Sequence, residues 1–270
     1  MNAKKKLAVI TGASSGMGLE FAKAIAQTES LDEMWLIARR LDRLLALKNV
    51  LETQYPTISF RAISLDLALE ESIQAYRMLL EKADCDLRIL VNGSGFGKFG
   101  SFSDISMEEY AGMIDLNSKS LVLMTYASLP YMASGAEIYN IDSLSAFQPV
   151  PYIAVYGATK SFVLSFSRAI NAEYKKKNIH IMAVCPGWVN TDFFKRAVKD
   201  DTISYFNRIY EPEDVIKRAL KDMKRKKDVS ILGFPVRLQV FATKLLPHKL
   251  VMKIWMNQQK KSKNADKIQK

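Results

Sequence analysis

The sequence predicts an α/β fold: a doubly wound parallel sheet with helices on both faces. Short apolar runs alternate with longer stretches whose apolar residues recur at helical spacing, the order typical of strand–helix–strand units. The runs are apolar on both sides, as expected for strands covered by helices above and below. The expected strands are 7–11, 34–38, 58–65, 87–92, 137–141 and 179–184, and the expected helices are 16–28, 41–54, 69–82, 107–133 and 153–177.

The pattern becomes less regular after Trp188. Aromatic and charged residues mix over 188–210, which we expect to form a flexible lid over a substrate. A helix from about Pro212 and a short strand at 229–233 follow. A C-terminal helical extension over about 234–260 is broken in two by Pro247. No repeat or linker interrupts the chain, so 1–270 are expected to form one domain.

The excess of positive charge is gathered in short segments. The net charge is +11, and much of it lies in 223–228 and after Met256. Such runs are typical of solvated surfaces and tails. No basic motif interleaved with aromatic residues favours nucleic acid, so we expect no nucleic-acid partner.

The cysteines and histidines show no metal-site spacing. Cys85 and Cys185 are far apart, and neither His180 nor His248 has a ligand-spaced partner. We therefore expect two buried thiols, no disulfide and no metal. The apolar run at 7–10 is too short for a signal peptide or a membrane span, which predicts a cytoplasmic location.

A glycine-rich loop joins the first expected strand to the first expected helix. In "TGASSGMG" the glycines are Gly12, Gly16 and Gly18. A tight turn here lets a pyrophosphate approach the backbone, and the helix N-terminus offers N–H groups and partial positive charge. The sequence therefore predicts a dinucleotide site.

Two arginines follow the second expected strand. A site that prefers NAD usually carries an acid about twenty residues beyond the glycines, but Arg39 and Arg40 stand there. Guanidinium groups suit a 2′-phosphate, which favours NADP(H) as cofactor. The alternative is that both arginines only begin a solvated helix.

The segment "VYGATK" places Tyr156 and Lys160 four residues apart on an expected helix. Residues at this spacing share a helix face, so both side chains can point toward one site. A neighbouring positive charge lowers the pKa of a phenol, which would suit Tyr156 to proton transfer. Alone, the pair is equally typical of an ordinary amphipathic helix.

Together these motifs resemble the short-chain dehydrogenase/reductase family of the single-domain type, with TGxxxGxG and YxxxK, over about 5–191. The resemblance implies a Rossmann fold and a catalytic set of Ser143, Tyr156, Lys160 and Asn117. Tyr156 would donate a proton to a carbonyl oxygen that Ser143 holds, Lys160 would tune Tyr156 and bind the nicotinamide ribose, and Asn117 would help hold a water. The cofactor-binding positions implied or predicted are Gly12, Ser14, Ser15, Gly16, Met17, Gly18, Arg39, Arg40, Asp66, Leu67, Asn92, Gly93, Tyr156, Lys160, Pro186, Gly187, Val189 and Thr191.

Two positions depart from the family pattern. Gly93 stands where the family has a second Asn that braces the sheet, and Asp142 precedes Ser143 where another Ser is common. The contacts of the missing Asn must be lost or replaced. Whether Asp142 faces the site stays open.

The expected substrate is a hydrophobic alcohol or ketone. The segments 94–101 and 144–152 supply aromatic residues and prolines but no charge suited to an acid, and the lid over 188–210 adds further aromatic residues. A steroid, a bile acid or a long-chain carbonyl compound would fit, as in a hydroxysteroid dehydrogenase.

The basic, apolar C-terminal segment has three readings: cover for the pocket, contact with a partner subunit, or contact with a membrane surface. We favour the first two, with a homodimer or homotetramer, because the family is commonly oligomeric. The main alternative functions are a non-catalytic dinucleotide-binding regulator, which only Gly93 favours, and a membrane-surface lipid reductase.

Overall fold

A seven-stranded sheet forms the centre of the computed structural model, which describes residues 4–193, 197, 203, 206 and 208–268, with side chains as far as Gln259. All neighbouring strands are parallel, in the order β3-β2-β1-β4-β5-β6-β9. This confirms the predicted doubly wound α/β fold. The strands are β1 (Lys5–Thr11), β2 (Glu33–Ala38), β3 (Ser59–Ser64), β4 (Cys85–Asn92), β5 (Glu137–Ile141), β6 (His180–Val184) and β9 (Val229–Ser230).

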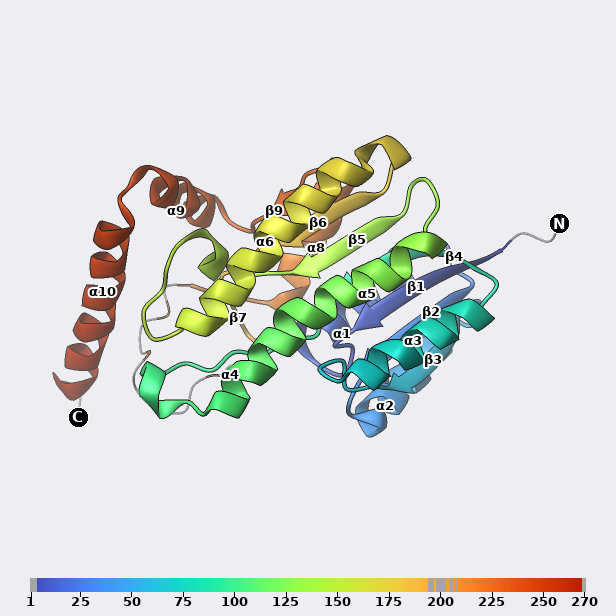
Figure 1. Cartoon of the computed structure of the whole chain (residues 1–270), viewed down its shortest axis with the longest axis horizontal. Coiled ribbons are helices and arrows are strands. Elements are labelled where there is room, and N and C mark those ends of the chain that lie inside the picture. Colours follow the sequence, from blue (N-terminus) through green and yellow to red (C-terminus); the bar gives the residue numbers. More distant parts are fainter. Residues whose placement is uncertain (1–3, 194–196, 198–202, 204–205, 207, 269–270) are drawn as a thin grey trace.

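Helices cover both faces of the sheet (Figure 1). On one face lie α1 (Gly16–Thr28), α2 (Leu41–Gln54) and α8 (Pro212–Lys224). On the other lie α3 (Glu70–Lys82), α4 (Met107–Ile114), α5 (Ser120–Ser128) and α6 (Ala154–Tyr174). The strands are therefore buried on both sides, as their continuous apolar runs predict.

The alternation of side chains along each strand divides the core in two. In β1, Ala8 and Ile10 pack against the face of α1, whereas Leu7 and Val9 pack against the face of α3; all four are at most 1% exposed. A shift of register by one residue would exchange the two sets, so packing fixes the position of the glycine loop that follows β1.

The order of strands reverses at β1. The chain proceeds from β1 to β2 and β3 on one side, and then returns to place β4 on the other side of β1. At such a reversal the loops leaving the carboxyl ends of the strands diverge and open a crevice. Ligands of open α/β sheets bind in this position.

Two short strands and the two C-terminal helices lie outside the central sheet. Strands β7 (Trp188–Val189) and β8 (Ile209–Tyr210) form a small parallel pair, and α9 (Phe234–Leu245) and α10 (His248–Ile268) flank Pro247 as predicted. Figure 1 shows α10 standing beside the domain at one end of the molecule. Among the described residues, no helix combines the length and the apolar character needed to cross a bilayer.

Candidate active site

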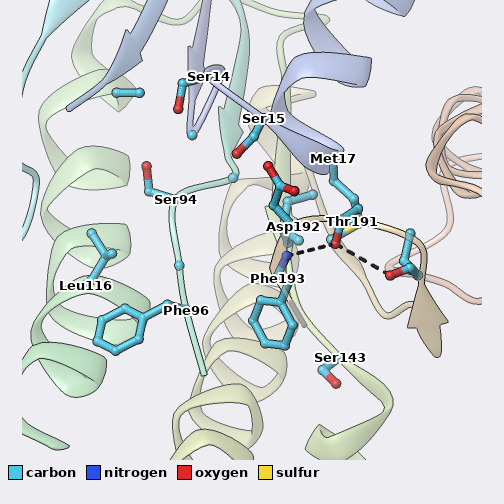
Figure 2. A pocket seen from close by; sticks show the side chains of 18 of the residues that line it. Ser14, Ser15, Met17, Ser94, Phe96, Leu116, Ser143, Thr191, Asp192 and Phe193 are labelled. Carbon is cyan, nitrogen blue, oxygen red and sulfur yellow. Dashed lines mark hydrogen bonds between the residues drawn. The ribbon is translucent and has the colours of Figure 1, made fainter. Parts of the chain in front are cut away.

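A cavity of about 370 Å³ lies at the carboxyl ends of the strands, where the strand order reverses. Loops that follow β1, β2, β3, β4, β5 and β6 all contribute to it. In Figure 2, Ser14, Ser15 and Met17 lie toward one end of the pocket and Ser143 toward the other. The predicted site residues that line it are Gly12, Ser14, Ser15, Gly16, Met17, Gly18, Arg39, Arg40, Asp66, Leu67, Gly93, Ser143, Tyr156, Lys160, Pro186, Gly187, Val189 and Thr191.

Close backbone contacts shape the glycine loop. Gly12 has φ +69°, and a Cβ there would lie 2.6 Å from the carbonyl oxygen of Gly93. A Cβ on Gly18 would collide with the carbonyl oxygen of Gly12. Only glycine fits at either position, and the resulting turn presents the first N–H groups of α1 to the cavity. This cradle suits a pyrophosphate group.

The arginines after β2 reach back to this loop. Arg40 Nη2 donates hydrogen bonds to Ser14 Oγ at 3.0 Å and to Ser15 Oγ at 2.8 Å. Arg39 instead forms an ion pair with Asp66, with 3.5 Å between Nη1 and Oδ2. The guanidinium group of Arg40 and the hydroxyls of Ser14 and Ser15 therefore lie together in the lining of the cavity. This set of hydrogen-bond donors suits a phosphate group.

Tyr156 and Lys160 come together with Ser143 in the interior of the cavity. Both are on α6, and Lys160 Nζ lies 5.6 Å from the centroid of the Tyr156 ring. Lys160 Nζ also donates a 2.7 Å hydrogen bond to the carbonyl oxygen of Ile141, at the end of β5. Ser143 follows β5 by two residues, so a strand end and a helix face bring the three side chains together.

Burial sets the protonation of this group. Loss of solvent raises the pKa of Tyr156 above its ordinary value, although a hydrogen bond with Ser143 acts in the opposite direction. The expectation from sequence that the pKa of Tyr156 is lowered is therefore wrong for this structure. Burial also lowers the pKa of Lys160, opposed by the negative charge of Asp142. A phenol with a raised pKa stays protonated at neutral pH.

Asp142, whose orientation the sequence left open, faces inward. Its side chain is buried and lines the cavity, and Oδ2 accepts a hydrogen bond from the Cys185 thiol at 3.4 Å. Among the described residues, Oδ1 has no hydrogen-bond partner. Burial raises the pKa of Asp142, while the positive charge of Lys160 lowers it. The departure from the family pattern thus places a carboxyl group among the catalytic candidates.

Asn92 does not line the cavity, contrary to its prediction as a cofactor-binding residue. Its Nδ2 donates to Thr125 Oγ1 at 3.1 Å and to Asn140 Oδ1 at 2.8 Å, within the layer between the sheet and α5. Asn140 Nδ2 continues the chain of hydrogen bonds to Ser167 Oγ in α6. These bonds link β4 and β5 to the helices above them, so Asn92 has a bracing role.

Gly93 has a steric reason for being glycine. A Cβ at position 93 would lie 2.6 Å from the carbonyl oxygen of Thr11. The backbone N–H of Gly93 also donates a hydrogen bond to Thr11 Oγ1 at 2.9 Å. A second Asn does not fit without a shift of the backbone. The neighbouring Asn92 braces the sheet through its hydrogen bonds to Thr125 and Asn140.

Asn117 also lies outside the lining of the cavity, but next to it. It belongs to a π-helical turn, η2 (Asp115–Lys119), between α4 and α5. Its amide group donates to the carbonyl oxygen of Phe96 and to Thr159 Oγ1, and accepts from the Phe96 N–H. It therefore pins the loop after β4 against α6, close to Lys160, rather than presenting its side chain to the cavity.

Several lining residues were not predicted as site residues from the sequence. Phe99 lies 5.9 Å from the Tyr156 ring and 6.0 Å from Phe193, and Phe193 lies 5.6 Å from Tyr156. Figure 2 shows the Phe193 ring in the part of the pocket near Ser143. The only sequence signal was the richness in aromatic residues of 94–101 and 188–210. The rest of the predicted lid, 194–196, 198–202, 204–205 and 207, lies outside the described residues.

A second cavity of about 260 Å³ adjoins the first and shares Ser143, Ser145 and the segment 186–188 with it. Its other walls are α9, α10 and the segment around η4 (Leu144–Phe147). Trp255 Nε1 of α10 donates a 3.1 Å hydrogen bond to the carbonyl oxygen of Pro151 and holds this wall in place. The C-terminal extension therefore covers a pocket, as one of the three readings of the sequence predicts.

Comparison with known proteins agrees with this geometry. A very-long-chain 3-oxoacyl-CoA reductase of Danio rerio is 31% identical over 223 residues, 80% of this chain and 68% of that protein. A short-chain dehydrogenase from Sphingobium yanoikuyae in complex with NADPH superposes with a TM-score of 0.77 at 29% identity, covering 88% of this chain and 92% of that one. A bulky-bulky ketone specific alcohol dehydrogenase from Comamonas testosteroni gives 0.72 at 27% identity, covering 87% and 88%.

The family model described as short chain dehydrogenase matches residues 6–202, which is most of the chain. The match contains the glycine loop, Asn117, Ser143, Tyr156, Lys160 and the segment 186–191. The chain therefore belongs to the short-chain dehydrogenase family of oxidoreductases.

Proposed function

We propose that the protein is an NADP(H)-dependent oxidoreductase that interconverts a secondary alcohol and a ketone, on a hydrophobic substrate. The observation that carries this proposal is the meeting of Ser143, Tyr156 and Lys160 in one cavity with the glycine cradle. When bound, the reduced nicotinamide supplies a hydride to the carbonyl carbon. The residues of this chain supply the proton and hold the oxygen.

Tyr156 is the proton donor in ketone reduction. Its raised pKa keeps the phenol protonated at neutral pH, so it can transfer a proton to the carbonyl oxygen as negative charge develops there. Ser143 donates a hydrogen bond to the same oxygen and stabilises that charge. Lys160 is held by the Ile141 carbonyl, and its amine would bind the ribose of the cofactor. Asn117 acts as a positioning residue for the loop after β4.

The preference for NADP(H) rests on Arg40. Its position beside Ser14 and Ser15 gathers donors for a phosphate, and no carboxylate occupies the end of β2 to repel one. Asp66 and Leu67 line the same end of the cavity, where the adenine ring would lie. The cytoplasmic location and the homodimer or homotetramer stay predictions, as does the single domain over 1–270.

The hydrophobic substrate is supported by the walls of both cavities. Phe99 and Phe193 contact Tyr156, Trp188 packs against Phe99, and apolar residues of α9 and α10 line the second cavity beyond Ser143. A bulky ketone, such as a steroid, a bile acid or a long-chain carbonyl compound, would fill this space. Two relatives named for bulky ketones and very-long-chain 3-oxoacyl groups point the same way.

A series of methyl ketones tests this proposal. With NADPH, kcat/KM for reduction should rise about fourfold for each added methylene until the second cavity is filled, because burial of one methylene contributes about 0.8 kcal/mol. Absorbance at 340 nm measures the rate. Constant kcat/KM along the series would contradict a hydrophobic substrate site. Absence of turnover with ketones, bile acids and steroids would favour the non-catalytic regulator. Gly93 no longer supports that alternative, because the lack of space for a side chain explains why this residue is glycine.

The substitution Asp142→Asn tests the charge beside the catalytic group. Oxidation of an alcohol requires Tyr156 as a phenolate, and the carboxylate of Asp142 raises the pKa of Tyr156. Removing this charge lowers that pKa, so the rise of the oxidation rate with pH should move to lower pH, while reduction at neutral pH changes little.

The pH–rate profiles of wild type and Asp142→Asn provide the measurement. Asp86→Asn is a matched control, because Asp86 also has a buried oxygen without a hydrogen-bond partner among the described residues but lies at the far end of β4. A shift to higher pH, or the same shift in the control, would show that Asp142 does not act on Tyr156.

A further inference from the structure

An apolar stripe runs along the outer face of α9. Phe234, Leu238, Phe241 and Leu245 follow one another at steps of four, three and four residues, so they share one side of the helix. Their exposed fractions are 69%, 56%, 59% and 69%. The opposite side of α9, with Val236, Val240 and Thr243, is buried against the domain. The packing of the domain therefore does not account for the apolar residues on the outer side of this helix.

The apolar surface continues onto the start of α10 and reaches the second cavity. Leu250 and Ile254 are 43% and 44% exposed, and Leu246 between the helices is 37% exposed. Leu246 and Ile254 also line the second cavity, together with Trp255. This cavity thus has walls that belong in part to the exposed apolar face. Contiguous surfaces of this kind mark contact with a partner or a membrane.

The charged residues of α9 and the start of α10 all have one sign, and the nearest acids of the domain, Asp222 and Asp228, are paired with other basic residues. Arg237, Lys244, Lys249 and Lys253 are all exposed, and the sequence contains no Asp or Glu from 229 to 265. A second copy of the chain would bring the same positive charge to a shared face, which disfavours contact between two copies through α9. Apolar residues flanked by lysine and arginine match a surface of anionic lipids in both respects.

We propose that the exposed face of α9 and the start of α10 binds a membrane surface that contains anionic lipids. The apolar stripe enters the boundary between headgroups and acyl chains, and the four basic residues contact the headgroups. An apolar ketone dissolved in the lipid then reaches Ser143 through the second cavity; this last step rests on the proposed function. For this face we therefore favour a membrane over the subunit contact that the sequence alone favoured, because the positive charge of two copies would repel.

Co-sedimentation with vesicles tests the proposal without any activity measurement. The full chain is mixed with phosphatidylcholine vesicles and with vesicles that contain about one third phosphatidylglycerol. Because interfacial binding combines apolar burial with attraction to anionic lipid, the wild type should bind the anionic vesicles at least about tenfold more tightly than the neutral ones.

Three variants separate the contributions. The stripe variant carries Phe234→Gln, Leu238→Gln and Phe241→Gln. It should bind anionic vesicles at least about tenfold more weakly, because it loses apolar burial. Lys244→Gln, Lys249→Gln and Lys253→Gln should remove the preference for anionic lipid and its sensitivity to salt. The control variant carries Val50→Gln, Met107→Gln and Tyr126→Gln. It removes exposed apolar residues elsewhere on the surface and should bind vesicles as the wild type does.

Three results would overturn the proposal. The first is a wild type that does not bind anionic vesicles, and the second is a control variant that loses as much binding as the stripe variant. The third is a stripe variant whose only change is a shift from dimer to monomer in light scattering, which would assign this face to a second copy of the chain. Reduction of a water-soluble ketone by the stripe variant should equal that of wild type. If no variant reduces any ketone but vesicle binding follows the expected pattern, the proposed function fails and the membrane surface stands.

Discussion

Replacing Tyr156 with phenylalanine should lower kcat/KM for ketone reduction by about 100- to 10,000-fold, the usual contribution of a general acid. The substitution removes one oxygen atom and leaves the ring in contact with Phe99 and Phe193. The carbonyl oxygen would then have no acid to take a proton from, and Ser143 alone would stabilise its charge. The rate with NADPH and a long-chain methyl ketone provides the measurement.

The control for this experiment is Tyr126→Phe. Tyr126 is 73% exposed on α5, far along the helix from the cavity, so the substitution should leave the rate unchanged. Binding of NADPH, followed by fluorescence, separates loss of the proton donor from weaker cofactor binding, because Tyr156 is also a predicted cofactor-binding residue. If Tyr156→Phe keeps more than about one tenth of wild-type kcat/KM, Tyr156 is not the proton donor.

Replacing Arg40 with alanine should weaken NADPH binding by about 10- to 150-fold with little effect on NADH, since hydrogen bonds to charged groups contribute about 1.5–3 kcal/mol. NADH lacks the 2′-phosphate that Arg40, Ser14 and Ser15 would surround. The ratio of the two dissociation constants therefore isolates this contact from general damage to the site.

Arg39→Ala is the matched comparison for Arg40→Ala. Its guanidinium group is paired with Asp66 rather than with the serines of the loop, so we expect a smaller effect on the ratio. Equal effects of the two substitutions would assign the phosphate to both arginines. A wild type that binds NADH more tightly than NADPH would overturn the preference for NADP(H).

Much of the fold could be predicted from the sequence because the signals are local. The apolar runs, the glycine turn and Pro247 mark strands and helix ends within a few residues of their observed positions. The expected helix 107–133 is less regular than predicted, since η2 interrupts it to place Asn117 against Phe96 and Thr159. That interruption depends on contacts with the loop after β4 and with α6, which no local pattern contains.

The candidate site could likewise be predicted from the sequence only in part. The spacing of Tyr156 and Lys160 and the glycines of the loop were visible in the sequence, and the structure places them around one cavity. The sequence did not show that the pKa of Tyr156 is raised. That shift comes from burial, to which Phe99 and Phe193 contribute from loops that are distant in the sequence. The inward side chain of Asp142 and the bracing role of Asn92 likewise depend on packing across the sheet.

The hydrogen bond from Trp255 to Pro151 joins α10 to the segment that connects Ser143 with Tyr156. Docking of α10 on a surface and occupation of the cavity beneath it would both order this one segment. Thermodynamic reciprocity then requires that each event raise the affinity of the other by the same factor. Trp255 is one of three tryptophans in the chain, so its indole fluorescence would follow both the docking of α10 and the occupation of the cavity.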